Sequence, residues 1–73
     1  MNLNPKIINK DIVKIVSDVG NQKKDVIPIL HAIQSKYNYL PELALREVCN
    51  LTHIRPADIT GISTFYSQFR KDP

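Results

Sequence analysis

Apolar residues recur at helical spacing in the first part of the chain. They lie at i, i+4, i+7, i+8 and i+11, which are the positions of one helix face, at Ile8, Ile12, Ile15, Val16 and Val19. Gly20 comes next, and glycine commonly ends a helix. Asn4 followed by Pro5 is a typical helix start, although Asn9 could cap a shorter version. We therefore predict a first helix over about residues 5–19 and leave its starting point open.

A second apolar stripe begins after a short polar connection. It consists of Val26, Ile29, Leu30, Ile33 and Tyr37. Asp25 is expected to act as the N-cap, with its carboxylate accepting free amides of the new first turn. Pro28 falls within that turn, where a missing N–H breaks no helical hydrogen bond. Asn38 readily adopts a left-handed conformation, so we predict a helix over residues 26–37 that ends there.

Two prolines introduce two further helices. Pro41 is expected at the first helical position of a helix over about 41–52, and Pro56 at that of a helix over about 56–65. The third stripe is Leu40, Ala44, Val48 and Leu51. The fourth is Ile59, Ile62, Tyr66 and Phe69, although the chain after Thr64 could leave the helix and extend. Ile54 and Ile59 have the spacing of a hydrophobic staple, and Gly61 is expected to permit close approach of a second helix.

No strand alternation occurs elsewhere, so the predicted fold is an all-α bundle of four short helices. A chain of 73 residues and 8.3 kDa has room for one core, which makes residues 1–73 a single domain. The composition, with 42% hydrophobic and 23% charged residues, is that of an ordinary globular protein.

Charge and cysteine content narrow the function classes. The net charge of +3 lies wholly in residues 1–36, with six lysines against three aspartates, and no basic run exceeds two residues. We therefore expect no nucleic-acid partner. A single cysteine cannot form an internal disulfide, and no apolar run approaches the ~20 residues that span a bilayer. These features predict a cytoplasmic protein without direct membrane insertion.

The candidate chemical groups do not assemble into a site. Cys49 and His53 have the spacing of half a zinc site, but only His31 remains as a further nitrogen ligand, and a structural zinc needs four ligands. Glu42 and Glu47 are five residues apart, so they point to different sides of a helix. Cys49 as a nucleophile lacks a second domain to form a cleft. We expect no catalytic, cofactor-binding or metal-binding residues in this chain.

The segment 58–69 allows one alternative function. Its Gly-Ile-Ser sequence at Gly61, followed by aromatic residues, is similar to a helix-turn-helix recognition segment. A small DNA- or protein-binding regulator is therefore the alternative. Its weakness is spacing, because a complete helix should precede the turn and only about one turn fits between Pro56 and Gly61. Arg70 and Lys71 would be its main phosphate contacts.

Three spaced segments together carry a more specific likeness. They are Ile27 to Gln34, Tyr39 to Leu45 and Gly61 to Phe69. In this order they resemble the N-terminal helical domain of the thioredoxin-like 2Fe-2S subunit of respiratory complex I (NADH dehydrogenase). Related NAD-dependent or bifurcating hydrogenases and formate dehydrogenases carry the same domain. The likeness runs from about Ile8 to Arg70. Asn38 departs from it, because the family usually has glycine there.

The resemblance implies a helical docking module that is not itself redox-active. In the family a thioredoxin-like domain follows and holds the 2Fe-2S cluster with four cysteines, so residues 70–73 would begin the linker to that absent domain. The implied partner is an NADH-oxidising flavoprotein with FMN and NAD, in the cytoplasm or peripheral to a membrane complex. The candidate partner-binding residues are Tyr39, Leu40, Pro41, Phe65, Tyr66, Phe69 and Arg70. For the Tyr39–Pro41 corner, core packing is the favoured role over direct partner contact, whereas for the three aromatic rings core packing and an interface role stay equally open.

Overall fold

The computed structural model of the chain describes residues 4–65 and 69–70, and for residues 63–65 it describes the backbone alone. Four α-helices and one 3-10 turn make up the described part: α1 (Pro5–Val19), η1 (Lys23–Asp25), α2 (Val26–Tyr37), α3 (Glu42–Leu51) and α4 (Pro56–Phe65). No strand occurs among these residues, so the predicted all-α class is confirmed. The predicted bounds of the first, second and fourth helices match the observed ones, and the third helix is one residue shorter at each end.

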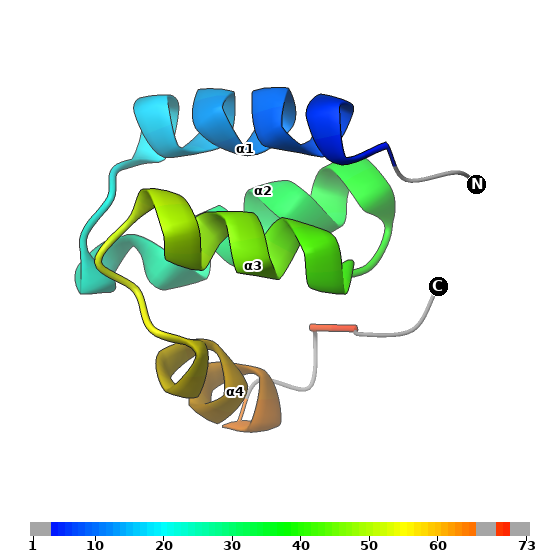
Figure 1. The fold of residues 1–73 in the computed structure, drawn as a ribbon. Helices are drawn as coiled ribbons and strands as arrows, with labels where there is room; N and C mark the ends of the chain where they lie inside the picture. The colour runs from blue at the N-terminus through cyan, green and yellow to red at the C-terminus, as the bar shows by residue number, and fades with distance from the viewer. Residues whose placement is uncertain (1–3, 66–68, 71–73) are drawn as a thin grey trace.

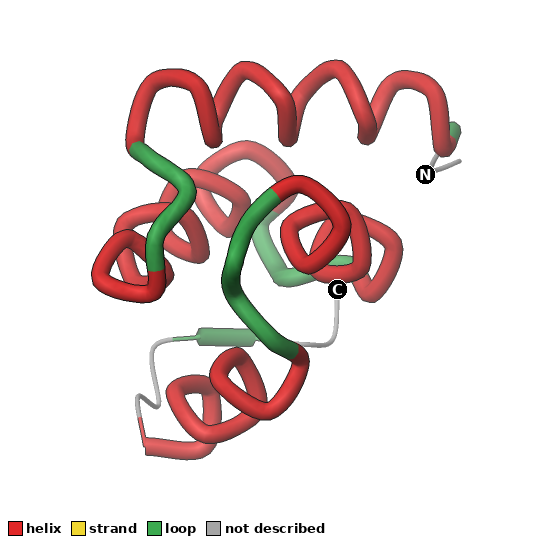
Figure 2. Tube along the Cα trace, turned by 60° about the vertical axis from the view of Figure 1, so that its left-hand side comes forward, coloured by secondary structure: helices red, strands yellow, loops and turns green. Residues whose placement is uncertain are grey.

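The helices are arranged in layers (Figure 1). α1 packs against both α2 and α3, and α4 packs beneath α3. In the turned view of Figure 2, α4 again lies on the side of α2 and α3 that is opposite to α1. The core therefore lies within the α2–α3 layer and on both of its sides.

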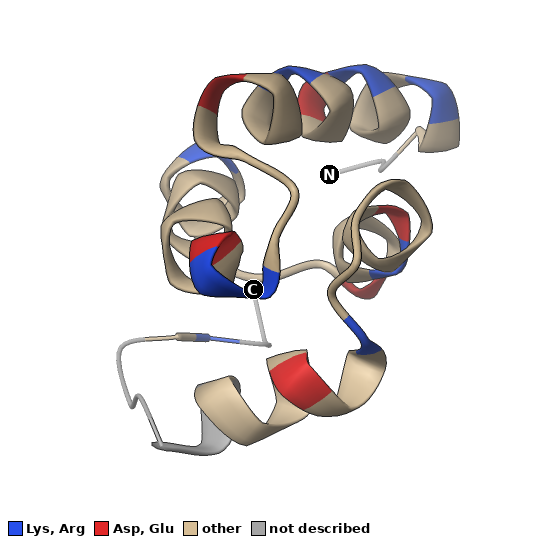
Figure 3. Ribbon diagram, turned by 90° about the vertical axis from the view of Figure 1, so that its left-hand side faces the viewer, with Lys and Arg blue, Asp and Glu red and all other residues tan. Residues whose placement is uncertain are grey.

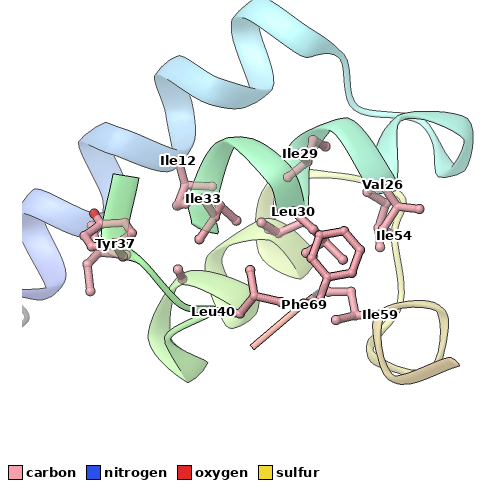
Figure 4. Packing of buried hydrophobic residues seen from close by; sticks show 13 residues of the cluster. Ile12, Val26, Ile29, Leu30, Ile33, Tyr37, Leu40, Ile54, Ile59 and Phe69 are labelled. Carbon is pink, nitrogen blue, oxygen red and sulfur yellow. The ribbon is translucent and has the colours of Figure 1, made fainter. Parts of the chain in front are cut away.

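Thirteen buried apolar residues form one continuous cluster (Figure 4). The residues with no exposed surface are Ile12, Ile29, Leu30, Ile33, Ala44 and Val48. All five residues of the predicted second stripe are buried. Among the other stripe positions that the structure describes, Ile15, Val16, Val19 and Ile62 are partly buried, whereas Leu51 at the end of α3 is 37% exposed.

The predicted signals at several helix ends are confirmed. The side-chain oxygen of Asn4 accepts a hydrogen bond from the Lys6 N–H at 2.9 Å, which selects the longer form of α1. Asn38 ends α2 in the left-handed region with φ of 69°. Ile54 and Ile59, on either side of the first turn of α4, are both buried as a hydrophobic staple requires.

Polar side chains tie α1 to the two helices beneath it. The Tyr37 hydroxyl donates a short hydrogen bond to the Asp11 carboxylate, which also lies 3.4 Å from the Lys36 ammonium. On the other side, the Asn9 amide donates to Glu47 of α3 at 2.7 Å. These contacts fix the rotation of α1 about its own axis.

The prediction that the Asp25 side chain caps the helix after it is wrong, because the carboxylate bonds to a residue before it. Its side chain makes no capping bond to α2 and accepts instead from the backbone N–H of Gln22 at 3.1 Å. The connection forms the 3-10 turn η1, which the sequence analysis did not predict. The carboxylate thereby closes the turn that precedes it.

Three further expectations need correction. Pro41 is the N-cap of α3 rather than its first residue, because its ψ of 139° is extended. Gly61 lies inside α4, and a Cβ added there would meet nothing within 4 Å, so it permits no close helix approach. Phe69 does not belong to α4, which ends at Phe65; the open alternative that the chain leaves the helix is the observed one.

Candidate functional site

The corner between α2 and α3 contains three of the candidate partner-binding residues. The left-handed Asn38 reverses the chain after α2, and Tyr39 follows it half-buried against the core. Leu40 is 1% exposed, and Pro41 is likewise fully buried. Of these three side chains, Tyr39 is therefore the one with substantial surface available to a partner.

The last described residues of the chain lie against this corner. We call Phe69–Arg70 the C-terminal strap. The backbone N–H of Leu40 donates to the Arg70 carbonyl oxygen at 2.6 Å. The Arg70 N–H in turn donates to the side-chain oxygen of Gln34, also at 2.6 Å. Two hydrogen bonds to one residue hold the strap between the end of α2 and the start of α3.

An aromatic side chain anchors the same strap. Phe69 is 7% exposed and belongs to the buried cluster, where it lies near Leu30, Leu40 and Ile59 (Figure 4). Its ring centroid lies 4.9 Å from that of His31 in a tilted arrangement. Of the two roles left open for Phe69, this geometry supports packing in the core, whereas Arg70 is exposed.

The structure thus joins the two halves of the candidate set. The corner and the strap, some thirty residues apart in sequence, meet through the bond between Leu40 and Arg70. The side chain of Phe65 and the whole of Tyr66 lie outside the described residues. Gln34 was not among the residues predicted from the sequence, and its half-buried side chain on α2 accepts the hydrogen bond that holds Arg70.

A groove of about 680 Å³ opens between α3 and α4 on one side of the corner. Its apolar lining includes Leu40, Leu45, Cys49 and Ile59. An ion pair on α3, from Arg46 to Glu42 at 2.9 Å, lies at its edge. The groove is open and mainly apolar, so it is better suited to contact with an apolar side chain of another protein than to catalysis by polar groups.

Cys49 does not have the character of a reactive or ligating thiol. Burial raises its pKa, and the negative charge of Asp58 raises it further, so the thiolate is disfavoured at neutral pH. Within the described part of the chain, no three His, Cys, Asp or Glu residues are grouped as metal ligands. A 2Fe-2S cluster needs four such ligands, and the whole chain has one cysteine. The residues of this chain therefore do not fit the cluster.

The helix-turn-helix alternative conflicts with the geometry. α4 runs without interruption from Pro56 to Phe65, so there is no turn at Gly61. α4 also contains no lysine or arginine and has an acidic residue, Asp58, in its first turn. A helix of this charge is poorly suited to the phosphates that flank a DNA groove.

Comparison with known proteins identifies the family. The sequence model of the family described as thioredoxin-like [2Fe-2S] ferredoxin matches residues 12–73. The chain belongs to this family. It is 31% identical to a subunit of NADH-quinone oxidoreductase from Buchnera aphidicola, over 93% of this chain and 44% of that protein. It is 24% identical to the proteins that carry the same name in Mycobacterium bovis and Mycobacterium tuberculosis, over 86% of this chain and 25% of each of those.

The resemblance seen in the sequence is therefore confirmed as membership of the family. The chain spans less than half the length of the curated relatives it matches. No solved structure matches the chain significantly. Among the described residues no helix is long and apolar enough to cross a bilayer.

Proposed function

We propose that these residues form the helical docking module of an NADH-linked iron–sulfur electron-transfer subunit, which binds an NADH-oxidising flavoprotein. The observation that supports this most is the family match over residues 12–73, together with relatives that are named as subunits of NADH-quinone oxidoreductase. The module itself is not redox-active in this proposal. The 2Fe-2S cluster belongs to a following thioredoxin-like domain, and FMN and NAD belong to the flavoprotein.

The corner and the strap have the properties that this role requires. The backbone of Arg70 is held by the Leu40 N–H and by the side-chain oxygen of Gln34, so the last described residue has a defined position beside the corner. A linker that starts at residues 70–73 would hold the next domain close to the corner. Tyr39 and Arg70, which both retain exposed surface there, are the residues that we propose contact the flavoprotein. The assembly is cytoplasmic or peripheral to a membrane in this proposal.

The test is direct binding of the chain to the NADH-oxidising flavoprotein from the same genome. Calorimetry should detect association at micromolar concentration or tighter. Arg70→Glu should weaken it, whereas Lys24→Glu, which alters another exposed cation with the same change in net charge, should leave it unchanged. No association of the unaltered chain at micromolar concentration would contradict the proposed function.

A further inference from the structure

The side chains on the outward face of α1 are not part of the buried core that the described residues form. The residues of this face, which we call the α1 outer face, are Lys6, Ile7, Lys10, Val13 and Lys14. All five side chains are exposed, and the two apolar ones are the most exposed large hydrophobic residues in the described part of the chain, at 58% for Ile7 and 46% for Val13. Figure 3 shows the basic residues recurring along the side of α1 that is turned away from the other helices.

The lysines on this face work against the helix that carries them. Lys6, Lys10 and Lys14 are spaced at i, i+4 and i+8, so each neighbouring pair repels. None of the three takes part in an ion pair among the described residues, because the nearby Asp11 carboxylate is bound by Lys36 and Tyr37 of α2. Asp18, four residues after Lys14, can offset part of this repulsion at one end of the row, but Lys6 and Lys10 have no acidic residue four positions away on α1.

The two ends of α1 are charged in the unfavourable sense as well. The first turn contains Lys6 and no acidic residue, although the positive end of a helix favours carboxylates. The last turn contains Asp18 and no basic residue, where the helix favours cations. These charges of α1 thus oppose the preferences of an isolated helix, and no contact within the described residues explains them. Positions of this kind are expected to serve a function.

We infer that the α1 outer face is a docking surface for an acidic protein surface, presented by a neighbouring subunit of the assembly named in the proposed function, on which this inference rests. Carboxylates on such a partner would neutralise a lysine row about 12 Å long, since α-helices rise 1.5 Å per residue. Ile7 and Val13 flank the row and would be buried by the same contact. This combination of charge and apolar surface is what an electrostatically steered protein interface uses.

Other occupants fit the surface less well. A symmetric pair of copies joined by this face would set one lysine row against the other. Nucleic acid would gain nothing from Ile7 and Val13, and the face has no arginine to bind phosphate in a bidentate manner. Lipid headgroups would also gain charge contacts, but the main apolar side of α1 is already buried in the bundle.

Lysine footprinting of the intact assembly, compared with the isolated 73-residue chain, tests this inference. An acetylating reagent labels exposed lysines, and mass spectrometry measures the labelling of each one. We expect labelling of Lys10 and Lys14 to fall about 10-fold in the assembly, as for side chains removed from solvent at an interface core. Lys23 and Lys24, which are also exposed and lie on η1, serve as controls and should keep their labelling. A carbodiimide should also link the protected lysines to Asp or Glu side chains of a neighbouring subunit.

Substitution separates a binding role from a structural one. Lys10→Gln/Lys14→Gln removes two charges, and so does the control Lys23→Gln/Lys24→Gln, which makes the two variants equal in net charge. The first should reduce incorporation into the assembly by about 10-fold, a change within the range expected for two lost exposed ion pairs. It should also raise the thermal midpoint of the free chain, because repulsion along α1 is relieved. The control should change incorporation less than about 2-fold.

The outcomes distinguish the two proposals. Absence of the chain from an NADH-oxidising assembly would overturn the proposed function and this inference with it. Presence in the assembly with Lys10 and Lys14 labelled as in the free chain would overturn the inference alone. Equal loss of incorporation by both variants would overturn it too, since net charge and not the α1 outer face would then be responsible. Protection that is abolished by nuclease or by detergent, without carboxylate cross-links, would assign the face to nucleic acid or lipid and reject the protein partner.

Discussion

Gly20, at the end of α1, is the position where a single methyl group should be most disruptive. Its φ of 136° and ψ of 173° lie in a region that is nearly exclusive to glycine. An added Cβ would also overlap the Asp25 carboxylate, with the carboxylate carbon only 2.7 Å away. That carboxylate accepts the bond from Gln22 that closes η1, so Gly20→Ala disturbs the backbone and the turn together.

The expected magnitude follows from these two effects. The backbone strain costs about 1–3 kcal/mol. Displacing the carboxylate from its hydrogen bond adds about 1 kcal/mol. A domain of this size rarely has more than about 3–5 kcal/mol of stability, so Gly20→Ala should remove most of it. In urea unfolding followed by circular dichroism, the midpoint should fall by about 2–4 M, with a slope near 1 kcal/mol/M.

The other glycine provides a matched control. Gly61→Ala places its methyl group in open space inside α4, where alanine is the better helix former. It should therefore stabilise the chain by about 0.5–1 kcal/mol, opposite in sign to Gly20→Ala. In an Asp25→Ala background the overlap disappears, and Gly20→Ala should cost only its backbone strain. A midpoint for Gly20→Ala within about 0.3 M of the unaltered chain would refute the reasoning.

Three other changes test the remaining contacts. Phe69→Ala, which empties the anchor of the strap, should cost about 3 kcal/mol in urea unfolding, whereas Leu51→Ala at an exposed site should cost less than about 1 kcal/mol; equal losses would contradict burial of the strap. Burial raises the pKa of Tyr37 to about 12, so stability should fall as pH rises from about 10 to about 12 and Tyr37→Phe should remove that part of the fall. The Arg55 N–H holds the pKa of Asp58 below its usual value, so its contribution is present at neutral pH and is lost as pH falls below 3.8; in Asp58→Asn that component of acid unfolding should be absent.

Helix ends were predictable where the backbone preference of a single residue determines the boundary. Asn38 identified the end of α2, because few residues other than glycine adopt a left-handed φ readily. Pro56 identified the start of α4 for a similar reason, since its fixed φ and missing N–H suit the first helical turn. Pro41 was misassigned by one residue because the same φ of −62° serves an N-cap and a first helical residue equally well, and only ψ distinguishes them.

The strap could not be predicted from the sequence. Its bond to Leu40 joins two backbone groups, and backbone groups are the same at every position. Phe69 continued the spacing of the fourth stripe, so helical periodicity assigned it to α4 although it reaches the core from outside any helix. The prediction for Asp25 was wrong for a related reason. The same carboxylate can close the turn before it or cap the helix after it, and the choice depends on the path of the preceding turn.

The two surfaces that we assign to partners lie on opposite sides of the bundle. α1 covers one side of the α2–α3 layer, whereas the strap lies on the other side with α4 (Figure 1). The domain has principal extents of 28 by 24 by 18 Å, and its body stands between the two surfaces. A single flat neighbour cannot contact both. The two proposals together therefore imply that the bundle lies between two different partner surfaces. Footprinting can test this implication, because the lysines of α1 and the exposed Arg70 would then be protected by different neighbours.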